Sequence, residues 1–371
     1  MAIKTLSIQG YRSIQSLRLS MDGINVVIGA NGSGKSNLYK AIYLLAKAVD
    51  GELAKTLALE GGMPSILWAG KKKKTTQTKA PVRLTLSIQL DDFSYEIACG
   101  LPKPTLSLFA LDPEIKEEHV WFGEGRRPSN TIIERQGSSA WITGQDGKRA
   151  SYPVGLSQSE SVLSQLQDPH LYPELFTLSN EIKKWRFYHH FRTDPESPIR
   201  SPQISVRTEI LSNDGHNLAA ALQTIIEIGN NELLNEVIDR AFPGSKLLIN
   251  VDNKTRFEIQ LQMPGILRPL EARELSDGTL RYLCLVAALL SPRPAALLAL
   301  NEPEMSLHPE LMQPLAELIV LASQHSQIWV TTHSLSLAKM IEHLSGKKPT
   351  SLIRTESGTE IDGLTPWERL I

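Results

Sequence analysis

Residues 29–36 read Gly-Ala-Asn-Gly-Ser-Gly-Lys-Ser, a complete match to the phosphate-binding pattern G-x-x-x-x-G-K-S. Gly29 and Gly34 allow the chain to curl tightly, and the curled backbone turns several N–H groups inward to form a nest for phosphate oxygens. Lys35 can reach the terminal phosphates, and Ser36 offers a hydroxyl to Mg²⁺. The residues expected to bind the nucleotide here are Asn31, Gly32, Ser33, Gly34, Lys35, Ser36 and Asn37.

The elements around this loop favour the same chemistry. Residues 24–28 form a short apolar run that predicts a buried strand, and Leu38, Ile42 and Leu45 recur at helical spacing after the loop. A strand, a loop and a helix in this order place the phosphates at a helix N-terminus, where the helix dipole favours anions. The alternative is a glycine-rich turn that binds nothing, and the flanking strand and helix favour the phosphate site over it.

A second strand ends in polar residues. Residues 295–300 are apolar and predict a buried parallel strand, followed by Asn301 and Glu302. Ligands of open α/β sheets bind at the carboxyl ends of such strands. In P-loop NTPases an acidic residue at the first position holds Mg²⁺, and the next one positions the attacking water. Asn301 is therefore the expected metal residue, and Glu302 the expected catalytic one.

Two further short motifs lie in the C-terminal part of the chain. Residues 275–279, Leu-Ser-Asp-Gly-Thr, open an apolar helix, so the Ser276 hydroxyl, the Gly278 N–H and the helix N-terminus could bind an anion together. A serine in this place alone is more often a simple helix cap. His333 directly follows another predicted strand, residues 327–332.

With Tyr-Arg-Ser-Ile at residues 11–14, these motifs resemble the SMC/RecF-type branch of the ABC ATPases, and most of all standalone RecF-like ATPases without coiled coils. The resemblance implies ATP and Mg²⁺ as cofactors and a head-to-tail homodimer that clamps two ATP molecules. In that family, Ser276 and Gly278 would grip the γ-phosphate of the nucleotide held by the opposite subunit. Lys35, Glu302 and His333 would be catalytic, with His333 sensing the γ-phosphate.

The same resemblance gives weaker assignments. Arg12 could approach the nucleotide phosphates, although it could equally be a surface residue of its strand. The loop at residues 306–309, Ser-Leu-His-Pro, would cross the dimer interface. The family's lobe-switch glutamine has no clear counterpart, with Gln89, Gln136 and Gln145 as candidates.

The expected fold is an α/β P-loop NTPase of the ABC/SMC-head type. We predict a mixed central sheet with an antiparallel β layer and an inserted helical lobe. The expected domains are residues 1–150, the nucleotide-binding lobe with the antiparallel layer; 151–269, a largely helical lobe; and 270–371, which completes the ATPase core. Within the middle, residues 156–186 and 216–242 show helical patterns, and residues 247–251 and 256–261 predict a hairpin.

The net charge, the cysteine count and the lengths of the apolar runs limit the class of protein, but they do not show whether it binds DNA. A net charge of −1 neither supports nor excludes DNA binding, so a DNA surface would have to be a local patch. The run Lys71–Lys74 is one candidate, although such runs are usually solvated loops. Two cysteines predict a reducing cytoplasm. The absence of an 18-residue apolar run and of a signal-peptide pattern predicts no membrane segment.

Families of this kind usually have Asp or Glu at position 301, whereas this chain has Asn. Because Mg²⁺ prefers carboxylate oxygens, three interpretations of Asn301 stay open. The amide oxygen could hold the metal-bound water with Glu302 still catalytic, the protein could hydrolyse ATP slowly as a switch, or it could be an inactive nucleotide-binding scaffold.

The biological role also has alternatives. A double-stranded-DNA-linked ATPase in repair, recombination or genome defence comes first, followed by an ATP-gated platform that recruits an effector protein. A transporter subunit is disfavoured by the Tyr-Arg-Ser-Ile and Glu-Pro-Glu-x-x-Leu-His-Pro patterns.

Overall fold

The computed structural model describes residues 1–70, 83–103, 107–144, 147–204, 206–252 and 255–363. The chain forms two compact units. Unit 1 comprises Met1–Asp22, Gly29–Trp185 and Thr350–Ile371, and unit 2 comprises Gly23–Ile28 and Arg186–Pro349. Two candidates from the sequence, Lys71–Lys74 and Gln145, lie outside the described residues. The domain boundaries proposed at residues 150/151 and 269/270 stay a prediction.

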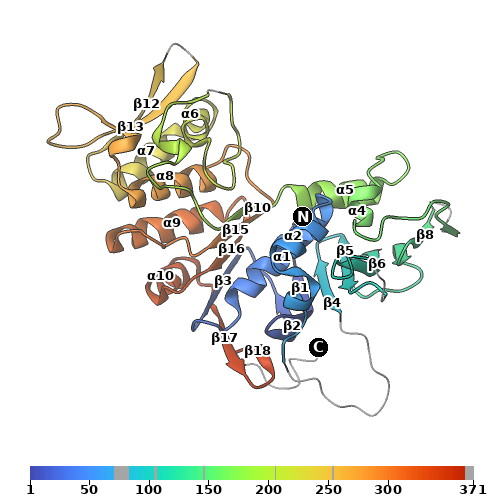
Figure 1. Ribbon diagram of the computed structural model, residues 1–371. Coiled ribbons are helices and arrows are strands. Elements are labelled where there is room, and N and C mark those ends of the chain that lie inside the picture. The colour runs from blue at the N-terminus through green and yellow to red at the C-terminus, as the bar shows by residue number, and fades with distance from the viewer. Residues whose placement is uncertain (71–82, 104–106, 145–146, 205, 253–254, 364–371) are drawn as a thin grey trace. The chain divides into compact units, whose positions relative to one another are not determined.

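Unit 1 is built on an eight-stranded antiparallel sheet, as the alternating sequence pattern predicts (Figure 1). Its order is β2-β1-β4-β5-β6-β7-β8-β9. One face is apolar because alternate residues point the same way; on β4, Leu84, Leu86 and Ile88 are buried while the residues between them are half-exposed. The strands are β1 (Thr5–Tyr11), β2 (Ile14–Ser20), β4 (Leu84–Gln89), β5 (Phe93–Gly100), β6 (Glu114–Phe122), β7 (Thr131–Gln136), β8 (Ser139–Thr143) and β9 (Arg149–Ser151).

The principal helix of unit 1 is α1 (Lys35–Val49), which begins at the glycine-rich loop and buries the predicted stripe of Leu38, Ile42 and Leu45. The other elements of this unit are α2 (Leu53–Leu59), α3 (Gly62–Ile66), α4 (Val162–Gln165), α5 (Pro173–Lys183) and the hairpin of β17 (Thr350–Thr355) and β18 (Gly358–Ile361).

Unit 2 contains a run of parallel strands in the order β10-β15-β16-β3. These are β10 (Arg186–Tyr188), β15 (Leu297–Asn301), β16 (Gln327–Thr331) and β3 (Ile24–Gly29), which continues directly into the glycine-rich loop. The N-terminal and C-terminal segments therefore share one sheet, as predicted. The central β15 and β16 are buried along their whole length. The carboxyl ends of these parallel strands meet at one edge of the sheet.

Helices cover this sheet and complete one apolar core. They are α8 (Asp277–Leu289), α9 (Met312–Ala322) and α10 (Leu335–Ser345), with η3 (Pro309–Leu311) before α9. The predicted helices and hairpin of the middle region are present as α6 (Leu218–Ile228), α7 (Asn231–Ala241), β12 (Lys246–Asp252) and β13 (Arg256–Gln262). The remaining elements are η1 (Pro198–Arg200), β11 (Gln203–Ile204), β14 (Leu270–Glu271) and η2 (Ala272–Glu274). No helix among the described residues is long and apolar enough to cross a bilayer.

Candidate nucleotide site

The loop before α1 has the backbone that its glycines predict. Gly29, Gly32 and Gly34 have φ values of 153°, 77° and 108°, in a region that side chains disfavour. A Cβ atom on Gly34 would lie 2.3 Å from Oγ1 of Thr359. The loop is thus closely backed by protein on the side of Gly34, whereas a Cβ atom on Gly32 would meet nothing within 4 Å.

The charges around the loop suit a phosphate. Helix α1 has no acidic residue in its first turn and no side-chain cap at its N-terminus, so no side chain of that turn competes with an anion at the positive end of the helix. The ammonium group of Lys35 is held 2.7 Å from the Gly29 carbonyl oxygen and 3.1 Å from that of Ala30. The Ser33 hydroxyl is buried and makes no hydrogen bond within the described chain. These features fit a nucleotide phosphate, with Ser36 exposed at the end of the loop.

A polar support behind the loop was missed by the sequence reasoning. The hydroxyls of Ser13 and Thr359 lie 2.7 Å apart, and the Thr359 N–H donates to the Ser13 carbonyl. Asn37, expected to bind the nucleotide, donates its amide N–H to the Ser13 hydroxyl at 2.8 Å. Its observed contact is therefore with the protein that backs the loop, and its role toward a nucleotide stays a prediction.

Arg12 is also engaged with protein. Its guanidinium lies 2.6 Å from Oε2 of Glu60, which also pairs with Lys40 at 3.2 Å. The backbone of Arg12 has a φ of 47°, in the left-handed region that favours glycine. This ion pair uses only one end of the guanidinium, which has five N–H donors, and the role of Arg12 toward a phosphate stays a prediction.

At the carboxyl edge of the unit 2 sheet, Asn301 is 4% exposed and bonded at both ends of its amide. Its Oδ1 accepts from the Thr331 hydroxyl at 2.8 Å, and its Nδ2 lies 2.8 Å from Nδ1 of His189. His189 directly follows β10 and was missed, because a strand of three residues gives little periodicity in the sequence. One lone pair of the Asn301 oxygen is thus used within the protein, and an amide oxygen carries two.

The structure brings Glu302 and His333 together. Oε1 of Glu302 lies 2.9 Å from Nε2 of His333. Glu302 has a φ of 49°, a strained conformation for a residue with a side chain. Its N–H donates to the Thr331 carbonyl at 2.7 Å, which ties the exit of β15 to the end of β16. A carboxylate and an imidazole so placed could position or activate water and contact a phosphate.

Glu304, two residues further on, binds the turn that carries His333. Its Oε1 accepts hydrogen bonds from the Thr332 hydroxyl at 2.5 Å, the His333 N–H at 3.0 Å and the Ser334 N–H at 3.1 Å. Glu304 was not predicted from the sequence. Its position within the Glu-Pro-Glu triplet was the available signal.

Residues 275–279, which correspond to the signature loop of the ABC-type ATPases that the sequence resembles, cap the start of α8. The Ser276 hydroxyl accepts from the Thr279 N–H at 3.1 Å, and Ser276 is exposed. A Cβ atom on Gly278 would lie 2.7 Å from the Ser306 carbonyl oxygen, so only glycine lets this loop approach the turn after β15. Ser306 itself has a φ of 64°.

An acidic residue at this helix start is neutralised. Asp277 lies in the first turn of α8, where its charge would oppose binding of an anion. The guanidinium of Arg200 lies 2.5 Å from Oδ1 of Asp277 and donates to the Leu275 carbonyl oxygen at 2.8 Å. Arg200 was not predicted from the sequence, because it belongs to η1, 77 residues before Asp277 in the chain.

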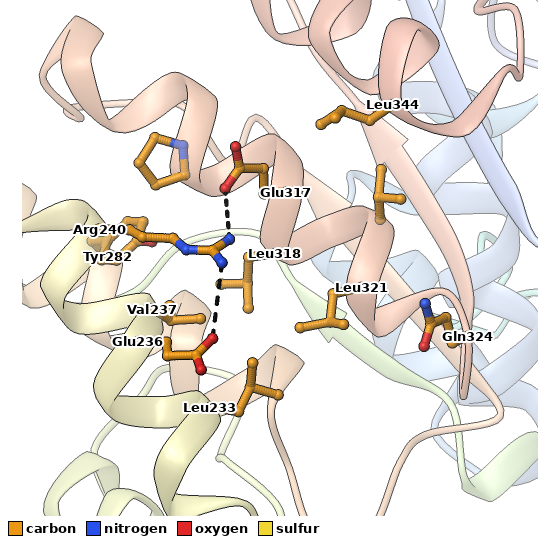
Figure 2. A pocket seen from close by; sticks show the side chains of 12 residues that line it. Leu233, Glu236, Val237, Arg240, Tyr282, Glu317, Leu318, Leu321, Gln324 and Leu344 are labelled. Carbon is orange, nitrogen blue, oxygen red and sulfur yellow. Dashed lines mark hydrogen bonds and ion pairs between the residues drawn. The ribbon is translucent and has the colours of Figure 1, made fainter.

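A hollow of about 380 Å³ in unit 2 is separate from these motifs (Figure 2). It lies between α7 and α9, with Arg240 between Glu236 and Glu317 at its polar end and leucines along its floor. None of the site residues expected from the sequence lines it. Among the described residues, no group of three or more His, Cys, Asp or Glu side chains is arranged to hold a metal ion.

Comparison with known proteins decides the family. A family model described as "AAA domain, putative AbiEii toxin, Type IV TA system" matches residues 24–339, most of the chain. The chain belongs to this AAA-domain family. This match agrees with the predicted resemblance to SMC/RecF-like P-loop ATPases of the ABC type.

The fold of this AAA-domain protein is that of SMC heads. It aligns with an SMC head bound to the C-terminal winged-helix domain of ScpA with a TM-score of 0.56 and 16% identity, over 99% of both chains. An SMC head with an extended coiled coil, bound to the C-terminal domain of ScpA derived from Pyrococcus furiosus, aligns with a TM-score of 0.51 and 15% identity. That alignment covers 100% of this chain and 98% of the other. These similarities establish the fold alone.

Sequence similarity to curated proteins is local. The chain is 47% identical over 49 residues to the DNA replication and repair protein RecF of Bacillus cytotoxicus and, equally, to that of Bacillus cereus (strain B4264). The matched segment spans 13% of this chain and 13% of each relative's length.

Proposed function

We propose that this protein binds and hydrolyses ATP with Mg²⁺, and that ATP clamps two copies into a head-to-tail homodimer. The observation that carries the proposal is the 2.9 Å contact between Glu302 and His333 at the carboxyl edge of the parallel strands. Strand β3 belongs to the same parallel set and runs directly into the glycine-rich loop. The family supports a nucleotide function for these residues, while the activity itself is our proposal.

We assign each of these residues a role in ATP binding or hydrolysis. The loop N–H groups and Lys35 bind the phosphates, and Ser36 and Asn301 hold Mg²⁺ or its bound water. Mg²⁺, when bound, neutralises charge on the phosphate oxygens. Glu302 orients the attacking water and accepts its proton. His333 and, from the second copy, Ser276 and Gly278 contact the γ-phosphate.

The neutral Asn301 is compatible with this scheme. Its Oδ1 accepts only one hydrogen bond in the described structure, which leaves a lone pair for a metal-bound water. Because the position carries no negative charge, we expect weaker Mg²⁺ binding and slower turnover than a carboxylate would give. We favour a functional ATPase over an inactive scaffold because Glu302 and His333 are both present and in contact.

The homodimer follows from the arrangement of motifs. Each chain supplies one phosphate loop and one signature loop, and Ser276 is exposed at the N-terminus of the 13-residue helix α8. Neutralisation of Asp277 by Arg200 removes the charge that would repel a partner's nucleotide. Static light scattering tests this: we expect the mass to double with ATP, and Lys35→Ala to stay a monomer. Equal masses with and without ATP for both proteins would contradict the dimer.

For the biological role we propose a DNA-linked ATPase in repair, recombination or genome defence. Two names support this role: the relatives are DNA replication and repair proteins, and the family description names a toxin–antitoxin system. The second candidate is an ATP-gated platform for an effector protein, because the SMC heads of similar fold were solved bound to ScpA domains. ATPase activity that is stimulated by double-stranded DNA and lost at high salt would favour the first.

We also propose that the protein is located in the cytoplasm. Cys99 and Cys284 are both buried and unpaired, and burial raises the pKa of each thiol above its usual value, so neither is primed for disulfide chemistry. Such cysteines suit a reducing compartment. Fractionation of cells that produce the tagged protein would test the location.

A further inference from the structure

We propose that Glu304 is the residue that positions His333, an inference that rests on the function proposed above. The turn between β16 and α10 contains only Thr332, His333 and Ser334. All three donate a hydrogen bond to the same carboxylate oxygen of Glu304, at distances of 2.5, 3.0 and 3.1 Å. Hydrogen bonds to an ionised carboxylate are about twice as strong as neutral ones.

The conformation of this turn depends on the Glu304 carboxylate as a hydrogen-bond acceptor. Thr332 is fully buried, so its hydroxyl has no access to bulk water. Ser334 caps α10 with its own hydroxyl, which accepts from the Leu337 N–H at 3.1 Å. Without Glu304, the His333 N–H would lose this acceptor and the Ser334 N–H would keep only the Thr332 hydroxyl at 2.9 Å, so the turn could adopt other conformations.

Glu304 also sets the distance between the two residues of the proposed mechanism. It lies two residues after Glu302, and the Glu302 N–H is itself bonded to the Thr331 carbonyl oxygen at 2.7 Å. The exits of β15 and β16 are therefore joined on both sides of the contact between His333 and Glu302. A displacement of about 1 Å at reacting groups can cost about 100-fold in rate.

Glu304 is placed to position rather than to react. Its Oε1 already accepts three hydrogen bonds, and its Oε2 is buried and has no hydrogen-bond partner within the described chain. Neither oxygen is available to an attacking water. A glutamine at this place would keep one oxygen able to accept the same three bonds.

A double-mutant cycle tests the inference, with kcat and nucleotide affinity measured for Glu304→Ala, His333→Ala and the double variant. We expect Glu304→Ala to lower kcat about 100-fold with little change in ATP affinity. The double variant should be no slower than His333→Ala, because Glu304 acts through His333. Glu304→Gln should retain most of the activity, and the exposed Glu227→Ala serves as the control.

Two results would overturn the inference. A double variant much slower than His333→Ala would show that Glu304 acts independently, and a Glu304→Gln variant as slow as Glu304→Ala would show that the negative charge of Glu304 is required rather than an oxygen that accepts the three bonds. Wild-type turnover by His333→Ala would instead contradict the proposed function at His333, and the positioning role with it. If Glu304→Ala does not fold, Thr332→Val removes one of the three bonds and takes its place in the cycle.

Discussion

Nε2 of His333 lies 2.9 Å from Oε1 of Glu302, although the two residues leave different strands of the parallel sheet. The proposed water-activating group and the proposed γ-phosphate ligand therefore touch each other within one chain. His333 cannot direct the same ring nitrogen at a carboxylate and at a phosphate. Arrival of the γ-phosphate should release Glu302 toward water, which would couple recognition of ATP to its hydrolysis.

Replacement of Glu302 by glutamine tests the carboxylate's role. Glu302→Gln keeps the side-chain shape and loses the proton acceptor, so we expect kcat to fall by about 100- to 1,000-fold while ATP still binds. Turnover measured with excess ATP, beside equilibrium binding of a fluorescent ATP analogue, separates the two effects. Unchanged hydrolysis would remove Glu302 from the mechanism.

Restoration of a carboxylate at position 301 tests the metal assignment. Asn301→Asp adds a negative charge where Mg²⁺ is expected, so ATP binding should need less Mg²⁺ for half-saturation. A Mg²⁺ titration of ATP-analogue binding provides the measurement, with Asn250→Asp on an exposed position of β12 as the matched control. An identical Mg²⁺ dependence in the variant and the wild type would place the metal elsewhere.

His119 should make the fold acid-sensitive. Burial, and then the nearby Arg126, lower the pKa of His119 to about 4 from its usual 6.5. Between pH 6.5 and 4 the unfolded chain binds a proton that the folded chain excludes, so the stability falls as the pH falls through this window. We expect a loss on the order of 2 kcal/mol from this group.

Denaturant unfolding at pH 7.5 and pH 4.5 checks this pH dependence. His119→Gln should lose less stability than the wild type between the two pH values, whereas the exposed His343→Gln control should follow the wild type. Parallel losses in all three proteins would show that His119 is not responsible.

The elements that carry the motifs were predictable because their patterns are local. The apolar run of residues 297–300 has no polar interruption, as a strand buried on both faces requires. The glycine-rich loop follows its strand and opens its helix in the expected order. The alternation of Leu84, Leu86 and Ile88 on β4 is likewise a local pattern, typical of a strand with one buried face.

The partners that hold the site in place were not predictable, since they come from distant segments. Thr359 backs the phosphate loop from the C-terminal hairpin, and Arg200 reaches Asp277 from the end of η1. His189 meets Asn301 only because β10 joins the edge of the sheet beside β15. Each contact depends on strand register and order, which a single sequence leaves open.

The central claim is that each ATP site is completed by a second copy of the chain. Lys35→Ala disables the phosphate loop, and Ser276→Arg blocks the signature loop, so each variant alone should be inactive. A mixture contains heterodimers in which one site has both loops intact. We predict that mixing restores ATP hydrolysis well above the sum of the separate proteins, whereas a mixture as inactive as its components would contradict the composite site.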